Sequence, residues 1–504
     1  MKTKKLATLF LTALLVLSVL PFGAVAAPTA VTPTSTASIT VENAVKDDEL
    51  AAYKVVDTTY VAATNTLDHA WNSAFADYFS QTNGITNSAH TAYDVDSFAA
   101  LENDPDALKT LLAGLPEYIA NKSIDPVATQ TVTADKTATF ADLAMGEYFI
   151  RPTSTTSVYQ LMLQKIEPTV VGGTYKIDDL TFGAKHKEVS VDKAANKTSV
   201  TKNEKVTYTI TVDIPTYASQ ATDKSFYVAD RLPDGLTLDT GSIKVARNGT
   251  DITDAAGTQY TLNTMATAEY TFKLSVSTLQ YTDNWSANGG KQLVITYTAT
   301  LNDDDTTAVN TKETNTVTFD YSNYPYVENS HETKTDSVDV TTFEIKIDKF
   351  VKNQETNKLA GAKFDLYRTA TQAEIDAGLA VTIPHTTEKK GIKLEADKVT
   401  DTDGVATFKK YEANGDRYDY YLVETQAPSG YNLLDNAKKL NFTGNDVAET
   451  HGVYTVEVPN SSGIKLPITG GTGTVIFTVI GIALMVGAVV LLVVSRKKSA
   501  KESK

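Results

Sequence analysis

Short runs in which apolar and polar residues alternate fill much of the chain between residues 184 and 461. Three examples are "KVTYTITVDIP" (205–215), "KQLVITYTATL" (291–301) and "NTVTFDYSN" (315–323). A period of two puts successive side chains on opposite faces of a β-strand, so each run predicts a strand with one buried face. Many short strands separated by turn residues, with no long helical pattern, predict β-sandwich modules.

Residues 39–183 mix strand-like runs with two helical patterns. Apolar residues recur at helical spacing over 67–79, which predicts a first helix. Asp104 and Pro105 predict the start of a second helix that carries leucines at 108, 111, 112 and 115. The expected fold class is therefore mainly β, with a mixed α+β N-terminal domain at 39–183 followed by sandwiches at 184–340 and 341–461.

Both ends of the chain carry targeting signals. Residues 1–26 combine lysines, an apolar run and the small-residue cleavage site Ala24-Val25-Ala26, which are typical of a secretory signal peptide. Residues 474–495 contain no charge and are long enough to cross a bilayer as a helix, and the basic tail at 496–504 is expected to stay in the cytoplasm. We therefore expect an exported chain with a transmembrane segment near its C-terminus. Residues 27–38, rich in Pro, Thr and Ser, are expected to form an N-terminal arm.

Composition excludes several classes of function. The net charge is −15, and the exported part is more acidic still because both ends are basic, so nucleic acid is not an expected partner. The absence of cysteine excludes disulfides, thiolate metal sites and cysteine nucleophiles. The six histidines show no ligand-like pairing and the acidic turns lack the final Glu of a calcium loop, so neither metal nor cofactor is expected. No motif for turnover of an external substrate occurs, and the chain is not expected to be an enzyme.

The segment between the last sandwich and the apolar span resembles the LPxTG sorting signal of Gram-positive surface proteins. It consists of Leu466, Pro467, Ile468, Thr469 and Gly470. The resemblance implies that a sortase, which is a membrane transpeptidase, cleaves between Thr469 and Gly470 and transfers the Thr469 carbonyl to an amine. A plain membrane anchor is the alternative interpretation.

The last sandwich resembles the Cna-B domains of Gram-positive pilins and adhesins. The resemblance rests on "KIDKFVKNQETNKLAGAKFDLY" (346–367), "TDTDGVATF" (400–408) and "YYLVETQAPSGYNLL" (420–434). It implies that a Lys amine and an Asn amide condense into an isopeptide bond, helped by a buried carboxylic acid. Strand parity independently places Lys349, Glu424 and Asn460 on three apolar inward rows, and these residues fit the three roles. A buried Lys–Glu ion pair with a hydrogen-bonded Asn is the alternative.

The middle sandwich resembles the CnaA-like fimbrial domain, in which Asp takes the role of Glu. The matching segments are "FYVADRLPDGL" (226–236) and "NTVTFDYSNYP" (315–325). Parity points to Lys193, Asp230 and Asn315 as the lysine, acid and asparagine of a second isopeptide site. Spacing alone does not exclude Lys197 as the lysine or Asn310 as the asparagine of this site. The competing interpretation is that these residues are ordinary polar residues at the rim of the core and form no bond.

The order of these parts resembles a major backbone pilin of a sortase-assembled fimbria, with tandem immunoglobulin-like (Cna-type) sandwiches. The resemblance implies a secreted, cell-wall-anchored structural subunit that supports adhesion. Its expected partners are the sortase, other copies of itself, peptidoglycan, and tip and basal pilins. In that family a lysine in a YPK-type motif near the end of the first domain links the subunits. Here "FGAK" stands in that place, so Lys185 is the first candidate and Lys187 the second.

A monomeric wall-anchored adhesin or minor pilin is the competing hypothesis. In that case Lys185 and Lys187 are solvated lysines of an interdomain linker. The first domain would then bind a host or matrix ligand, and its sequence contains no motif that identifies such a ligand.

Overall fold

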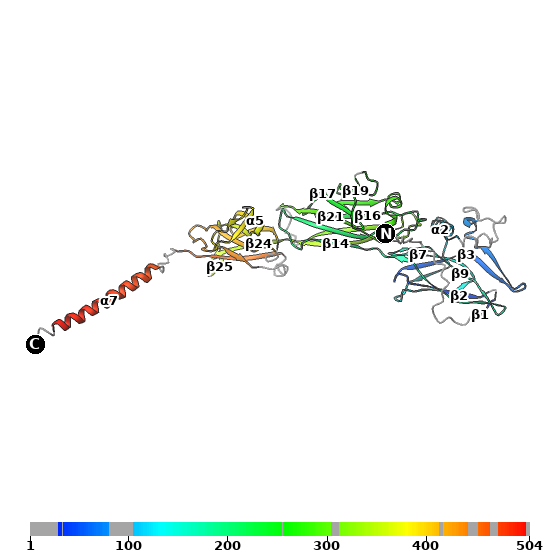
Figure 1. Cartoon of the computed structure of the whole chain (residues 1–504), viewed down its shortest axis with the longest axis horizontal. Helices are drawn as coiled ribbons and strands as arrows, with labels where there is room; N and C mark the ends of the chain where they lie inside the picture. The colour runs from blue at the N-terminus through cyan, green and yellow to red at the C-terminus, as the bar shows by residue number, and fades with distance from the viewer. Residues whose placement is uncertain are drawn as a thin grey trace, which may run out of the picture. The chain divides into compact units, whose positions relative to one another are not determined.

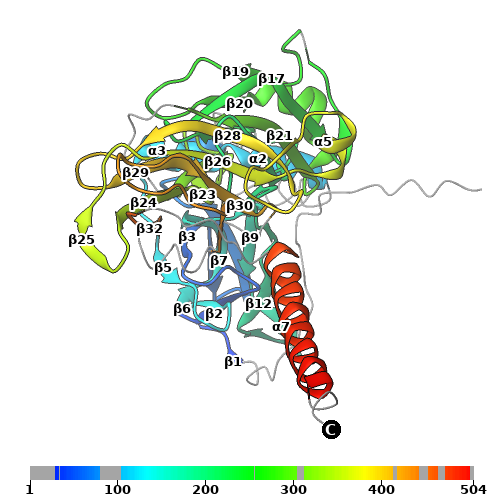
Figure 2. The same ribbon diagram turned by 90° about the vertical axis from the view of Figure 1, so that its left-hand side faces the viewer.

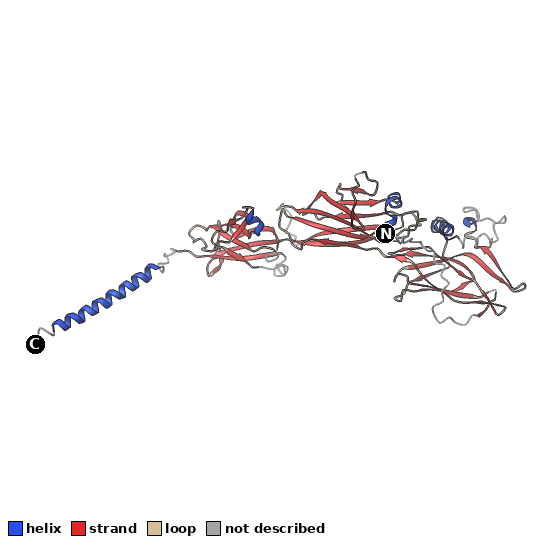
Figure 3. Ribbon diagram, in the orientation of Figure 1, coloured by secondary structure: helices blue, strands red, loops and turns tan. Residues whose placement is uncertain are grey.

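Strands form most of the elements in the computed structural model of the chain (Figures 1 and 3). The structure describes residues 29–32, 34–79, 104–254, 256–303, 312–412, 417–441, 452–463 and 472–499. It divides into two compact units, Met1–Thr342 (unit 1) and Phe343–Lys504 (unit 2). The mainly β fold class predicted from the sequence is confirmed.

Three small sheets lie wholly within the described residues of the first half of unit 1. Their strands are β1 (Thr29–Ala30), β2 (Thr36–Glu42), β3 (Glu49–Val61), β4 (Thr66–Trp71), β5 (Ala128–Thr131), β6 (Ala138–Ala144), β7 (Gly146–Ser154), β9 (Met162–Ile166), β10 (Thr169–Val171), β11 (Thr174–Ile177) and β12 (Leu180–Gly183). The sheet orders are β4-β3-β7-β9 with β5 also on β3, β12-β2-β6, and β1-β11-β10. Strand β1 and the start of β2 lie within 27–38, so the expected N-terminal arm takes part in this fold.

Two short helices, α2 (Pro105–Ala113) and α3 (Leu115–Lys122), belong to the same half. The Asp104 side chain caps α2 by accepting a hydrogen bond from the Ala107 amide at 3.2 Å, and a proline occupies the first helical position. The predicted helix start at Asp104 is confirmed. The single predicted leucine pattern covers two helices because the chain turns at Gly114.

The helix predicted over 67–79 is wrong for its first half. Thr66–Trp71 is strand β4, which pairs antiparallel with β3 and places Trp71 opposite Val56. A spacing of four residues is even, so Leu67 and Trp71 share one face of a strand as well as one face of a helix. Pairing with β3 decides between the two periods, and helical turns begin only at residue 76.

The second half of unit 1 is a sandwich of two five-stranded antiparallel sheets. Its strands are β14 (Val191–Ala195), β15 (Lys205–Asp213), β16 (Phe226–Arg231), β17 (Leu236–Arg247), β18 (Thr250–Asp251), β19 (Thr261–Asn263), β20 (Phe272–Val276), β21 (Gln292–Leu301), β22 (Lys312–Ser322) and β23 (His331–Thr341). The sheet orders are β14-β15-β21-β17-β18 and β19-β20-β16-β22-β23. Short helical segments α4 (Thr278–Gln280), η2 (Tyr281–Trp285) and η3 (Ser286–Asn288) connect β20 to β21. The strands predicted from the three alternating runs are confirmed as β15, β21 and β22.

The two halves of unit 1 contact each other directly. Strand β13 (His186–Lys187) pairs with β8 (Val158–Tyr159), so pairing with the first half continues past residue 183. The Tyr321 hydroxyl donates to the Thr156 carbonyl at 2.6 Å, and the Asn323 amide donates to the Thr155 carbonyl at 2.8 Å. These contacts hold β22 and the loop that follows it against the first half.

Unit 2 is a second sandwich, and one of its sheets has the order β27-β28-β26-β30-β31. Strands β28, β26 and β30 of this sheet are labelled in Figure 2. The strands of unit 2 are β24 (Phe343–Val351), β25 (Gln354–Lys358), β26 (Lys363–Thr369), β27 (Val381–Thr382), β28 (Lys390–Val399), β29 (Val405–Tyr411), β30 (Tyr420–Gln426), β31 (Lys438–Leu440) and β32 (Val453–Asn460), with the short helix α5 (Gln372–Asp376). The facing sheet has the order β25-β24-β29, and β32 also pairs with β24. The first strand of unit 2 therefore lies parallel to its last strand, β32.

Helix α7 (Thr472–Ser499) follows the sandwich of unit 2. Among the residues that the structure describes, no helix is long and apolar enough to cross a membrane. The transmembrane segment predicted at 474–495 is therefore not supported. The predicted signal peptide and the Leu466–Gly470 motif lie outside the described residues.

Candidate functional site

Unit 2 brings Lys349, Glu424 and Asn460 together inside its sandwich. Lys349 lies on β24, Glu424 on β30 and Asn460 at the end of β32, and each is at most 1% exposed. The parallel pairing of β24 with β32 sets Lys349 opposite Val458, two residues before Asn460. The inward placement predicted from strand parity is confirmed, because the apolar rows of these strands continue directly into the three polar residues.

The acid of this cluster contacts both of its neighbours. The Lys349 Nζ lies 3.7 Å from Glu424 Oε1, and the Asn460 amide donates to the same oxygen at 2.8 Å. The second oxygen, Oε2, accepts the Leu434 amide at 2.8 Å, which fixes the carboxyl group. Asn460 Oδ1 is buried and has no hydrogen-bond partner among the described residues. A buried acceptor without a donor costs about 1–3 kcal/mol, so this amide oxygen is poised to accept a proton or hydrogen bond.

Burial changes the protonation of the lysine in this cluster. Desolvation lowers the pKa of Lys349 to about 8, although the nearby Glu424 opposes the shift. A substantial fraction of the amine is then neutral near physiological pH, and only the neutral amine is a nucleophile. Lys349 also donates to the Val458 carbonyl at 2.9 Å, which holds Nζ beside the strand that carries Asn460.

Unit 1 brings Lys193, Asp230 and Asn315 into a second buried cluster, on β14, β16 and β22. Their exposed fractions are 5%, 0% and 0%. Lys193 Nζ is in direct contact with Asp230 Oδ2. Burial lowers the pKa of Lys193 and raises the pKa of Asp230, and both shifts favour a neutral amine beside a neutral carboxylic acid. Asn315 Oδ1, like its counterpart in unit 2, has no partner among the described residues.

A fourth residue, Tyr297 on β21, joins the cluster of unit 1. Its hydroxyl lies 3.0 Å from Lys193 Nζ, 2.8 Å from Asp230 Oδ1 and 2.7 Å from Asn315 Nδ2. The sequence prediction missed this residue. The sequence could have indicated it. Tyr297 lies two and four residues after Ile295 and Leu293 in the alternating run at 291–301, so its side chain faces the core with theirs.

The sequence alternatives for the unit 1 cluster are placed differently. Lys197 is partly exposed and pairs with Glu204 at 2.5 Å. Asn310 lies outside the described residues. Of the two lysines considered, the structure therefore brings only Lys193 to the acid and the asparagine.

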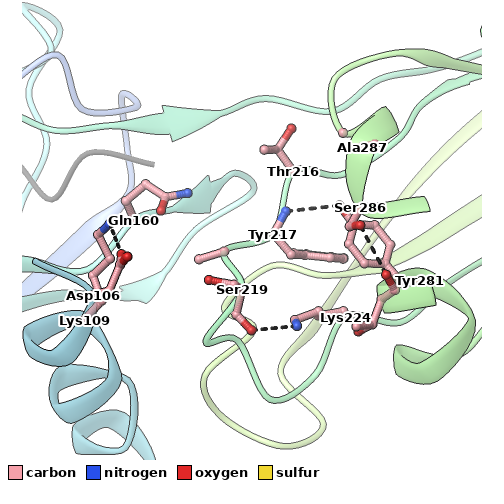
Figure 4. A pocket seen from close by; sticks show the side chains of 13 residues that line it. Asp106, Lys109, Gln160, Thr216, Tyr217, Ser219, Lys224, Tyr281, Ser286 and Ala287 are labelled. Carbon is pink, nitrogen blue, oxygen red and sulfur yellow. Dashed lines mark hydrogen bonds and ion pairs between the residues drawn. The ribbon is translucent and has the colours of Figure 1, made fainter. Parts of the chain in front are cut away.

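A pocket of about 710 Å³ lies within unit 1 (Figure 4). Both candidate linking lysines contact residues at its walls or next to them. Lys185 and Lys187 are both exposed. The Lys185 carbonyl accepts a hydrogen bond at 2.9 Å from Gln160, which lines the pocket. The Lys187 side chain lies beside Gly290, next to the lining residue Gly289. The walls come from α2 in the first half and from η2, η3 and the 216–219 segment in the second.

Within the described ranges, no group of three or more His, Asp or Glu residues is arranged to hold a metal ion.

Three family models match separate parts of the chain. Residues 203–325 match the Gram-positive pilin backbone subunit 2, Cna-B-like domain; residues 343–458 match the SpaA prealbumin-like fold domain; and residues 458–501 match the LPXTG cell wall anchor motif. The sequence comparison likened the middle sandwich to CnaA-like domains, but the family model that matches it describes a Cna-B-like domain. The last sandwich, likened above to Cna-B domains, matches a model described as a prealbumin-like fold. The anchor match confirms the predicted sorting signal and the location at the cell wall.

Whole-chain comparisons find similar proteins among fimbrial subunits. The fimbrial subunit type 1 of Actinomyces viscosus is 26% identical over 335 residues, which cover 58% of this chain and 61% of that relative. The chain thus spans about three fifths of that curated relative. The T6 backbone pilin of serotype M6 Streptococcus pyogenes shares the fold with 17% identity and a TM-score of 0.61, covering 86% of this chain and all of that one. The major pilin SpaA of Corynebacterium diphtheriae is 18% identical with a TM-score of 0.52, covering 84% of this chain and all of that one.

The fold and the domain and anchor matches together define a cell-wall-anchored protein of tandem pilin-type sandwiches. The resemblance to Gram-positive backbone pilins drawn from the sequence is confirmed by these matches.

Proposed function

We propose that the chain is a backbone subunit of a covalent Gram-positive pilus, linked by sortase and stabilised by one isopeptide bond in each sandwich. The observation that carries the proposal is the burial of a Lys–acid–Asn set in both sandwiches of a chain that ends in a cell-wall anchor signal. A cell-surface fibre must resist pulling and proteolysis, and this chain has no cysteine for disulfides.

In unit 2 the reaction joins Lys349 to Asn460. The neutral amine attacks the Asn460 side-chain carbonyl carbon, a bond forms between Lys349 Nζ and that carbon, and the amide nitrogen leaves as ammonia. Glu424, in contact with both groups, takes the proton that the amine loses and returns one to the leaving nitrogen. The acid is unchanged at the end, so the step balances without a cofactor.

The position of this bond would allow the sandwich of unit 2 to resist a pulling force. It ties β24, the first strand of unit 2, to β32, the last strand of the sandwich, which lie parallel and adjacent. A force applied to the two ends of the sandwich then passes through the covalent link and leaves the strands between them unloaded. A bond between Lys193 and Asn315 would join β14, the first strand of the sandwich in unit 1, to β22, the strand before its last.

The intact mass of the full chain, produced in cells without a sortase, tests the bonds. Each condensation releases one ammonia, about 17 Da, so a deficit of two ammonias is expected. Asn315→Ala and Asn460→Ala are each expected to retain a deficit of one. Asn357→Ala, at an exposed position, is the control that retains both. A wild-type chain at its full calculated mass would overturn the proposal for both sandwiches.

Polymerisation by sortase is expected to use a lysine beside the pocket of unit 1. A second subunit would deliver its Thr469 carbonyl to Lys185 or Lys187, both of which are exposed there. An immunoblot of the cell wall should show a ladder of large species that resists boiling in detergent. Lys185→Ala or Lys187→Ala should abolish it, and Lys122→Ala, an exposed lysine on α3, should not. A single band from the wild-type chain would favour the monomeric adhesin.

A further inference from the structure

The hydroxyl of Tyr297 lies at the centre of the cluster in unit 1. It contacts the amine, the acid and the amide of that cluster at 3.0, 2.8 and 2.7 Å. No hydrogen bond joins Asp230 directly to Asn315 among the described residues. In unit 2 the Glu424 carboxyl group makes the equivalent contact with Asn460 at 2.8 Å and needs no intermediary.

The ring of Tyr297 is held so that its hydroxyl has little freedom. It stacks on Tyr208, its cross-strand partner, with ring centroids 5.4 Å apart, and Phe272 packs edge-on at 5.0 Å. The residue is 1% exposed. Burial raises the pKa of the Tyr297 hydroxyl, so that it keeps its proton and can act as a neutral donor.

The contacts define a path for one proton. The hydroxyl can donate a single hydrogen, which points at Asp230 Oδ1, and its oxygen can accept from Lys193 and from Asn315. A group bonded to both the acid and the leaving nitrogen can pass a proton from one to the other by giving its own and taking a replacement.

We propose that Tyr297 is a catalytic residue that carries the proton from Asp230 to the nitrogen that leaves Asn315. The proposal rests on isopeptide formation in the second half of unit 1. A bond forms between Lys193 Nζ and the Asn315 side-chain carbonyl carbon, and the bond from that carbon to Nδ2 breaks. Tyr297 gives its proton to the departing nitrogen, the neutral Asp230 acid re-protonates the tyrosine, and the proton lost by the Lys193 amine restores the Asp230 acid. Ammonia leaves, and both Asp230 and Tyr297 return to their starting states.

Tyr297→Phe in the full chain tests this role, because it removes one oxygen and keeps the stacked ring. Samples are taken from early times of synthesis onward, and peptide mapping assigns each lost ammonia to its sandwich. We expect the Lys193–Asn315 bond to form at least ten-fold more slowly than in the wild-type chain, while Lys349–Asn460 forms at the wild-type rate. Formation of both bonds at wild-type rates would overturn the proposal.

Two controls separate the role of Tyr297 from other outcomes. Tyr281→Phe removes a buried hydroxyl that donates to the Pro215 carbonyl at 2.8 Å in the same sandwich, and should leave both rates unchanged. A wild-type chain that never forms the Lys193–Asn315 bond contradicts the proposed function of that sandwich, whereas an unchanged rate in Tyr297→Phe contradicts only the role of Tyr297.

A second measurement applies if Tyr297→Phe fails to fold this sandwich, as limited proteolysis of the full chain would show. The wild-type chain is then recovered unfolded from inclusion bodies and refolded in H₂O and in D₂O. A relay that moves an additional proton should slow the unit 1 bond more in D₂O than the unit 2 bond. Equal slowing in the two sandwiches would overturn the relay.

Discussion

The two buried clusters use the same three kinds of residue but bring the acid to the amide in different ways. In unit 2, Glu424 reaches Asn460 directly at 2.8 Å. In unit 1, Asp230 is one methylene shorter, and the Tyr297 hydroxyl occupies the position between the carboxyl group and Asn315. We therefore expect the length of the acid and the residue that lies between it and the amide to act together in each sandwich.

The largest expected effect is on stability, and it should be nearly equal in the two sandwiches. The bonds would close loops of about 110 residues in unit 2 and about 120 in unit 1, and in the chain-entropy account a loop of about 100 residues is worth about 4.7 kcal/mol. Asn460→Ala and Asn315→Ala should therefore each lower the free energy of unfolding of their own sandwich by about 4–5 kcal/mol. Calorimetry of the full chain measures both, with Asn357→Ala as the control.

A large difference between the two variants would break the comparison. If Asn460→Ala destabilises its sandwich by the expected amount and Asn315→Ala changes nothing, only unit 2 is crosslinked. Lys193 and Asp230 would then form an ordinary buried pair, with Tyr297 as their hydrogen-bond partner.

A second prediction uses pH to detect a free amine in unit 2. In Asn460→Ala, Lys349 stays unbonded, and its pKa of about 8 when folded lies below the ordinary value of 10.5. Between these two pKa values the unfolded chain binds more protons than the folded chain. The free energy of unfolding therefore rises as the pH rises from about 8 to about 10.5, and it falls again as the pH is lowered. The gain in the free energy of unfolding is at most about 3.4 kcal/mol for a shift of this size.

The wild-type chain is the control for that pH dependence. An isopeptide nitrogen does not titrate in this range, so the wild-type unit 2 should lack the extra rise that Asn460→Ala shows. Denaturant unfolding at pH 8 and pH 10 compares the two chains. The same rise in both would show that Lys349 is a free amine in the wild-type protein as well.

Most of this arrangement could be predicted from strand parity and motif resemblance. Parity was sufficient for Lys349, Glu424 and Asp230, because a residue two positions beyond a buried apolar residue in a regular strand must face the same core. The helix expected at 67–79 failed because a spacing of four fits both periods, and only pairing with β3 distinguishes them. Local pattern contains no information about which distant strand a segment joins.

The contact between Tyr297 and the unit 1 cluster illustrates the same limit. Its inward direction could be read from the sequence, but its hydroxyl meets Asn315 only because β21 lies in the sheet that faces β22. The distance between a tyrosine on one sheet and an amide on the other depends on the packing of the sandwich. Sequence spacing cannot supply that distance.

The smallest expected effect concerns the length of the acid, and it tests the comparison most directly. Glu424→Asp draws the carboxyl group back by about 1.5 Å from Asn460, the position that Tyr297 fills in unit 1, so the unit 2 bond should form about ten-fold more slowly. Peptide mapping at early times measures the rate, and the unit 1 bond is the internal control.

The converse change, Asp230→Glu, extends the acid toward Asn315 at some cost in packing. Combined with Tyr297→Phe, it should restore part of the rate lost in Tyr297→Phe alone, because a longer acid no longer needs the hydroxyl to reach the amide. If the double variant is slower than either single variant, the reach of the acid is not what distinguishes the two sandwiches.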